Sequence, residues 1–177
     1  MLFALVIYFY DLTWLSLEYW ILCLGLVIGS FIDLDHMILP DEITLGGIVI
    51  GFLGAWLNPE RQLLDALFGF LFGGGILWAV AYVYYVFTGR EGLGGGDIKL
   101  LAWLGTLLGW KAIPFILLSG SIFGSMIGLA VSRNRAEGLK TMIPFGPFLA
   151  FGALLYLFGL KSVGTWYVDL FFPALSQ

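Results

Sequence analysis

Two aspartates lie at the edges of apolar segments in this sequence, Asp33 at the end of one segment and Asp97 at the start of another. Ionisable side chains are expensive to keep in or beside lipid, so each is a candidate for a functional role. Two carboxyl groups that meet in a poorly solvated site cannot both ionise readily, so such a pair keeps one proton. The ionised member can deprotonate a water molecule while the protonated member hydrogen-bonds a peptide carbonyl. The two residues therefore predict an aspartic protease, with no metal and no cofactor.

Around Asp33 the sequence holds two further carboxylates, Asp35 and Asp41, and the only histidine, His36. Side chains two positions apart on a helix point in different directions, so Asp33 and Asp35 cannot form the pair. Asp41 follows Pro40 and precedes an apolar run, which favours an N-cap role for Asp41. We expect Asp35 and His36 to be polar groups at the membrane interface, with Asp35 supporting the active site.

Asp97 follows Gly-Leu-Gly-Gly-Gly at 92–96. Glycine permits positive φ and close approach by another backbone, so Gly94 and Gly96 are expected to shape an active-site loop. The segment lacks the G-x-G-x-x-G pattern and a flanking strand, which argues against a dinucleotide or phosphate site. We expect Lys99 to anchor the loop at lipid headgroups, with pairing to a carboxylate as the alternative.

The composition predicts how these residues are held. Of the 177 residues, 60% are hydrophobic and 11% are charged, and the mean hydropathy is +0.99. Such a chain is expected to be an all-α, multi-pass membrane helix bundle, with the bilayer as a partner. We expect one membrane-embedded domain over 1–177. Its predicted elements are a partial helix at 1–11 and six spans at 14–32, 43–57, 63–87, 98–110, 112–132 and 142–160.

Other features of the composition narrow the function. The net charge of −4 is spread over short loops, and no basic run indicates nucleic-acid binding. Cys23 is the only cysteine, so neither an internal disulfide nor a C-x-x-C zinc site is available. Glycines recur four positions apart in most predicted spans, which predicts tight helix packing in lipid. These glycines are Gly25/Gly29, Gly47/Gly51, Gly69/Gly73, Gly105/Gly109 and Gly120/Gly124/Gly128.

The distribution of cationic residues predicts the orientation. Threading the six spans through a bilayer places the loops 33–42, 88–97 and 133–141 on one side. With Lys99 at its edge, that side has more Lys and Arg than the other. Its residues are Arg90, Lys99, Arg133, Arg135 and Lys140, against Arg61, Lys111 and Lys161 opposite. The excess marks the cytoplasmic side, so Asp33 and Asp97 are both expected there.

Three segments of the sequence resemble the type IV prepilin peptidases. They are FIDLDHMILPDEITL, EGLGGGDIKLLAWLG and IPFGPFLAFG, within a resemblance that covers about 14–160. Gly94, Gly96 and Asp97 supply the G-x-G-D motif that this family shares with presenilin-like proteases. The resemblance implies Asp33 and Asp97 as the catalytic pair. It also implies cleavage of short basic leaders from prepilins or pseudopilins of type IV pili or type II secretion, at the cytoplasmic face of the bacterial inner membrane.

Long members of that family carry an N-terminal domain with C-x-x-C motifs and also methylate the new pilin N-terminus. This sequence resembles a truncated or naturally short form without that domain, so methyltransferase activity is not expected. An archaeal preflagellin peptidase is an alternative within the family. Outside it, the same aspartates would suit a proton- or cation-coupled transporter, and Asp33, Asp35, His36 and Asp41 would suit a metal-dependent enzyme. The oligomeric state stays open.

Overall fold

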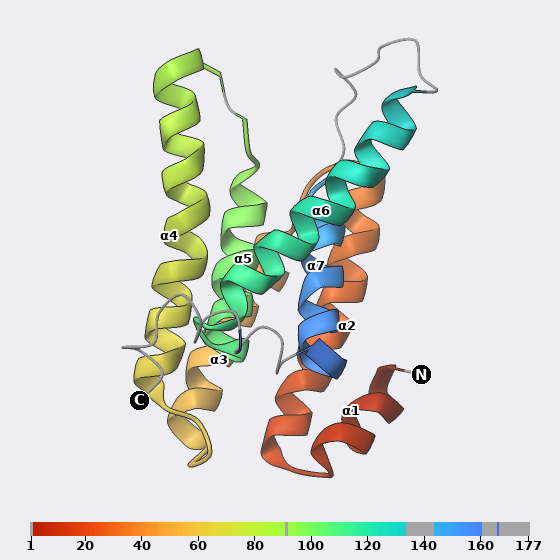
Figure 1. Cartoon of the computed structure of the whole chain (residues 1–177). Helices are drawn as coiled ribbons and strands as arrows, with labels where there is room; N and C mark the ends of the chain where they lie inside the picture. Colours follow the sequence, from red (N-terminus) through yellow and green to blue (C-terminus); the bar gives the residue numbers. More distant parts are fainter. Residues whose placement is uncertain (1, 91, 134–143, 161–165, 167–177) are drawn as a thin grey trace.

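The computed structural model describes residues 2–90, 92–133, 144–160 and 166, and this part of the chain is helical without strands. The predicted all-α class is therefore confirmed. The helices run up and down in a single bundle (Figure 1). They are α1 (Leu2–Tyr10), α2 (Trp14–His36), α3 (Asp41–Leu57), α4 (Leu63–Thr88), α5 (Gly95–Leu108), α6 (Ala112–Arg133) and α7 (Gly146–Leu155), which continues as a π-helical turn, Tyr156–Leu160.

Three of these helices, α2, α4 and α6, are long and apolar enough to cross a membrane by length and composition. The other predicted spans correspond to shorter helices, and a total of six crossings stays a prediction. α5 begins before the predicted 98, and residues 142 and 143 of the last span lie outside the described part. α2 runs past the predicted end at 32 because its backbone bonding continues to Met37, whose N–H is bonded to the Asp33 carbonyl. Asp33 thus belongs to the helix.

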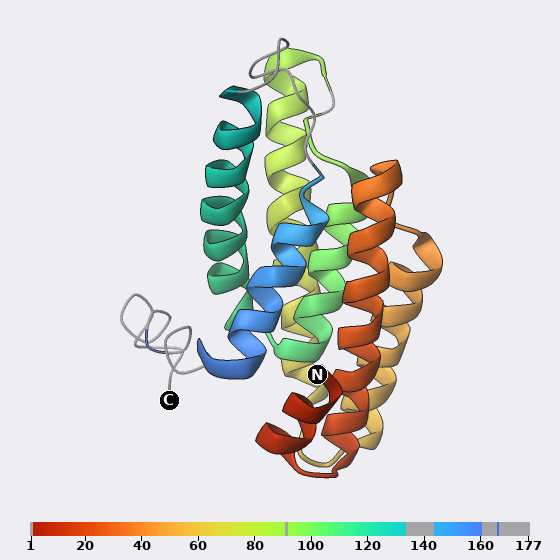
Figure 2. The same cartoon turned by 90° about the vertical axis from the view of Figure 1, so that its right-hand side faces the viewer.

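α5 is the central helix of the bundle. Its residues from Leu100 to Leu107 are all buried, as expected for a helix that has neighbours on every side. α4, α3 and α7 pack against it, and α6 crosses beside α7 (Figures 1 and 2). In both views α4 and α6 extend beyond the level at which α2 ends and α5 begins. The end of α2 and the start of α5 therefore lie below the tips of two projecting helices.

Close approach between helices explains several of the spaced glycines. A Cβ atom on either Gly69 of α4 or Gly105 of α5 would collide with the backbone carbonyl of the other. The indole of Trp103 lies against Gly25 of α2 and Gly47 of α3, again without room for a Cβ. The predicted role of these glycines in tight packing is confirmed at these four positions.

A buried polar network stabilises the end of the bundle remote from Asp33. Arg61 forms an ion pair with Glu18 and donates to the backbone carbonyls of Gly51 and Thr106. The Arg61 and Glu18 side chains are only 11% and 9% exposed. Arg61 follows α3, Glu18 lies on α2 and Thr106 on α5, so one guanidinium joins three parts of the bundle. The sequence alone indicates Arg61 only as a loop cation on the side opposite the aspartates.

Candidate active site

The structure brings Asp33 and Asp97 together across 64 positions of sequence. Asp33 lies in the last turn of α2 and Asp97 is the third residue of α5. They are buried, with 5% and 9% exposure respectively. The two carboxyl groups are close enough for the charge of Asp33 to act on Asp97. The pair is therefore poorly solvated and electrostatically coupled, and its catalytic role stays a prediction.

A third helix contributes a backbone donor to this pair. The N–H of Gly146, the first residue of α7, donates to Asp33 Oδ2 at 3.1 Å. The first N–H groups of a helix have no acceptor within the helix, so this donor is free to bind a side chain. Gly146 was not among the predicted site residues. It lies in the IPFGPFLAFG segment, but the sequence does not indicate that its amide faces Asp33.

The glycines before Asp97 lie at the start of α5 and differ in the space around them. Gly94, Gly95 and Gly96 all have negative φ, so none of them uses the left-handed backbone that glycine permits. Gly94 is the N-cap of α5 and its carbonyl accepts the Asp97 N–H at 3.2 Å. A Cβ on Gly96 would lie 2.8 Å from the Cβ of a neighbouring leucine, whereas a Cβ on Gly95 would meet nothing within 4 Å. Space, and not backbone conformation, distinguishes these glycines.

The leucine beside Gly96 is Leu39, which no motif in the sequence marks as a site residue. Its side chain is buried and comes within contact distance of positions on three helices. Cβ atoms built on Gly29, Gly96 and Gly146 would lie 3.4, 2.8 and 3.1 Å from Leu39 carbons. Leu39 therefore fills the space where α2, α5 and α7 meet, next to Gly96, which precedes Asp97, and to Gly146, which binds Asp33. Its position in a short connection offered no periodicity from which to infer this.

The remaining predicted polar residues point away from the pair. Asp35 and His36 are exposed, as expected from the divergence of positions i and i+2. Lys99 Nζ binds Asp41 Oδ1 at 2.5 Å, which is the carboxylate pairing that was the alternative to a headgroup anchor. Asp41 is not the N-cap of α3: Pro40 occupies that position and the Asp41 side chain makes no capping bond. The Asp41 carboxylate is instead paired with Lys99.

The positions of Asp33, Asp35, His36 and Asp41 do not suit the metal-dependent enzyme that was the alternative. In the part of the chain that the structure describes, no three His, Cys, Asp or Glu side chains gather where they could hold a metal ion. Asp33 is buried while Asp35, His36 and Asp41 are exposed, so these four side chains do not converge on one point. The proposed ligand set therefore has no shared centre.

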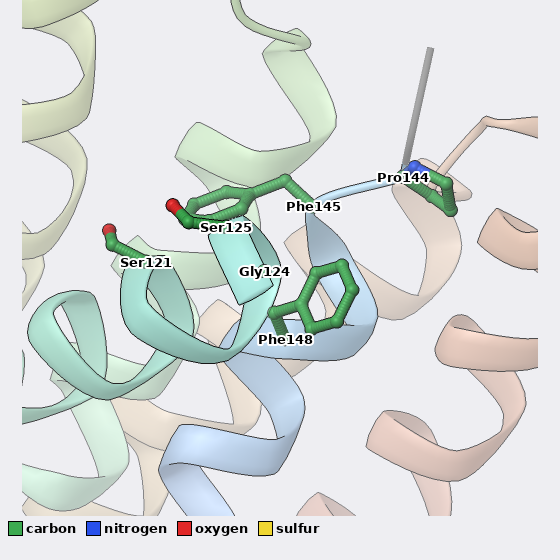
Figure 3. A pocket seen from close by; sticks show the side chains of 6 residues that line it. All are labelled: Ser121, Gly124, Ser125, Pro144, Phe145 and Phe148. Atoms are coloured by element: carbon green, nitrogen blue, oxygen red, sulfur yellow. The ribbon is translucent and has the colours of Figure 1, made fainter. Parts of the chain in front are cut away.

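A hollow lies between α6 and the start of α7, next to Gly146 (Figure 3). Its volume is about 230 Å³. Its wall combines two aromatic rings with two hydroxyl groups, and its lining residues are Ser121, Gly124, Ser125, Pro144, Phe145 and Phe148. Since Phe145 immediately precedes Gly146, this hollow is joined through the backbone to the donor that holds Asp33.

Comparison with known proteins is consistent with this site. Residues 20–129 match the type IV leader peptidase family, and the match includes both buried aspartates. The chain is 39% identical over 162 residues to a protein of Aeromonas hydrophila named prepilin leader peptidase/N-methyltransferase, covering 89% of this chain and 54% of that protein. A protein of the same name from Pseudomonas aeruginosa is 38% identical over 162 residues, covering 91% and 56%. A third, from Legionella pneumophila, is 39% identical over 158 residues, covering 89% and 54%.

The chain thus spans about half the length of these curated relatives. No solved structure matches it significantly. The family match covers more than half of the sequence and contains the G-x-G-D segment, and the relatives are similar over most of this chain. The chain therefore belongs to the type IV leader peptidase family.

Proposed function

We propose that this chain is a membrane-embedded aspartic endopeptidase that removes the leader peptide of type IV prepilins or pseudopilins. The observation that carries the proposal is the meeting of Asp33 and Asp97, both buried and within electrostatic range, in a chain of this family. The names of the relatives support the substrate class. The proposal covers the peptidase reaction only, and N-methylation is not assigned to this chain.

The chemistry follows from two carboxyl groups that share one proton. The ionised carboxylate takes a proton from a water molecule, whose oxygen attacks the carbonyl carbon of the scissile peptide bond. The protonated carboxyl group hydrogen-bonds the carbonyl oxygen and stabilises the charge that develops there. A proton then passes to the leaving amine as the C–N bond breaks. Low solvation strengthens each of these interactions.

We further propose that the site faces the cytoplasm from the bacterial inner membrane. The excess of Lys and Arg on the side that holds Asp33 and Asp97 supports this orientation. A leader with basic residues would then stay on the side where it is made, while the adjoining hydrophobic segment of the prepilin lies in the bilayer. Both aspartates terminate or begin helices, so neither sits at mid-helix depth where a transporter site is usual.

The test is cleavage of a purified prepilin by the chain reconstituted in liposomes. Asp33→Asn and Asp97→Asn should each slow cleavage by roughly 10⁴-fold or more, and the parent should cleave equally well with and without a chelator. Glu42→Gln is the matched control, since Glu42 is an exposed carboxylate at the start of α3. Cleavage near the parent rate in either aspartate variant contradicts the mechanism. Loss of activity in chelator would favour a metal enzyme, and proton flux without cleavage would favour a transporter.

A further inference from the structure

The two aspartates differ in what surrounds their carboxyl groups. Asp33 Oδ2 accepts the N–H of Gly146 at 3.1 Å. Among the residues that the structure describes, the Asp97 carboxyl group accepts no comparable backbone bond. Gly146 opens the ten-residue helix α7, so its amide also carries the partial positive charge of a helix N-terminus. One aspartate of the pair is thus held by a donor that favours its charged form.

Within the described part of the chain, the other charged groups near the pair do not reverse this difference. Asp97, on α5, is the acid within electrostatic range of Asp33 and is the other member of the proposed pair. α7 carries no titratable side chain over Gly146–Leu155. On α2, the side chains of Asp35 and His36 are exposed. On α3, Asp41 is neutralised by Lys99 and Glu42 is exposed. Among the residues that the structure describes, the Gly146 amide is therefore the group that distinguishes the two acids.

From this contact we propose that the Gly146 N–H makes Asp33 the ionised member of the pair, and hence the base that activates water, while Asp97 carries the shared proton. This assignment rests on the proposed peptidase function and adds a positioning residue to it. Gly146 itself touches no reacting atom. It acts through Asp33, because its N–H stabilises the ionised form of the carboxylate and fixes its orientation.

The assignment gives a balanced reaction. The Asp33 carboxylate takes a proton from water as the water oxygen bonds to the scissile carbonyl carbon, and the carbonyl oxygen takes the proton of Asp97. The resulting gem-diol breaks its C–N bond as protonated Asp33 gives its proton to the amine nitrogen. One hydroxyl proton of the diol returns to Asp97 as the carboxylic acid product forms. Both aspartates end in their starting states, and no co-reactant is consumed.

The same geometry explains why position 146 requires glycine. A Cβ on Gly146 would lie 2.6 Å from Asp33 Oδ2 and 3.1 Å from Leu39 Cδ1. Alanine would therefore push the Asp33 carboxylate away from its donor. Gly152, on the same helix, offers a matched contrast, since its Cβ would instead meet Ser119 Oγ at 2.5 Å. Alanine at 152 disturbs α7 packing without contacting Asp33.

Two variants test the assignment by steady-state cleavage of prepilin in liposomes. Gly146→Ala should lower kcat by roughly 100-fold with little change in KM, as expected for a reacting group displaced by about 1 Å. Replacement of residue 146 by glycolic acid turns the amide into an ester and removes the N–H without adding a Cβ. Because the lost donor favoured ionised Asp33, the acid limb of the kcat–pH profile should move up by about one to two pH units. Gly152→Ala should lower thermal stability and leave that limb in place.

A second measurement does not depend on turnover. The amide ¹H–¹⁵N NMR signal of Gly146, in detergent micelles, should shift in Asp33→Ala and stay unchanged in Glu42→Ala. An active ester variant with an unmoved acid limb overturns the assignment while leaving the peptidase function intact. A parent chain that cleaves no prepilin overturns the proposed function, and with it the assignment of a base. An unmoved Gly146 signal in Asp33→Ala overturns the contact itself.

Discussion

The glycines of the G-x-G-D segment offer a sharp test, because space distinguishes Gly96 from its neighbour Gly95. A Cβ on Gly96 would lie 2.8 Å from Leu39 Cβ, whereas a Cβ on Gly95 meets nothing within 4 Å. Both residues lie at the start of α5, so alanine at either position suits the backbone. Gly96→Ala should therefore impair the site and Gly95→Ala should not.

The size of the effect follows from the overlap. Carbon atoms in contact lie about 3.5–4.0 Å apart, so alanine at 96 requires a shift of about 1 Å between α5 and Leu39. Asp97 is the next residue, and it moves with the start of the helix. A misplacement of about 1 Å lowers the rate by roughly 100-fold, or about 2.7 kcal/mol in transition-state free energy. The loss should appear in kcat more than in KM, since the reacting groups are displaced.

The assay is cleavage of purified prepilin in liposomes, with kcat and KM measured for the parent, Gly96→Ala and Gly95→Ala. Thermal denaturation of each variant in detergent separates a local displacement from general unfolding. Equal activity of Gly96→Ala and the parent would refute the inferred contact with Leu39. Equal impairment of both variants would show that glycine is required there for a reason other than space.

Three further predictions concern stability, measured by thermal denaturation in detergent. Gly69→Ala should destabilise the bundle by about 1–3 kcal/mol, because α4 must move away from α5, while Gly75→Ala, with nothing within 4 Å of its Cβ, should not. Arg61→Met should lower the free energy of unfolding by about 3–5 kcal/mol because Glu18 is left buried without its partner; recovery on adding Glu18→Gln checks that cause, and an unaffected single variant would contradict it. Lys99→Met should change stability by less than about 1 kcal/mol, since its ion pair is exposed; a larger loss would show a further role.

The sequence predicted the helical class, the approximate helix positions and the location of Asp33 and Asp97 at helix ends. These features depend on local composition and on the alternation of spans, which hydropathy reports directly. It also predicted that Asp33 and Asp35 diverge, because that follows from helix geometry alone. The structure agrees, with Asp33 buried and Asp35 exposed.

The contacts that hold the site were not predictable in the same way. Gly146 lies 113 positions from Asp33 and binds it through a backbone amide, which leaves no mark on side-chain composition. Leu39 is one leucine among many, and its burial depends on how three helices meet. In the sequence Arg61 is indistinguishable from any other loop cation. Its contacts with Glu18 and two backbone carbonyls exist only in the folded bundle. Each is a long-range contact that the tertiary arrangement alone creates.

The central claim is that Asp33 and Asp97 act as one unit. A double-mutant cycle on kcat/KM for prepilin cleavage tests it most directly, using Asp33→Asn, Asp97→Asn and the double variant in liposomes. Residues that act as a unit are strongly non-additive, so the double variant should be no slower than the slower single variant. Losses that multiply in the double variant would show two independent roles and would contradict a shared-proton pair.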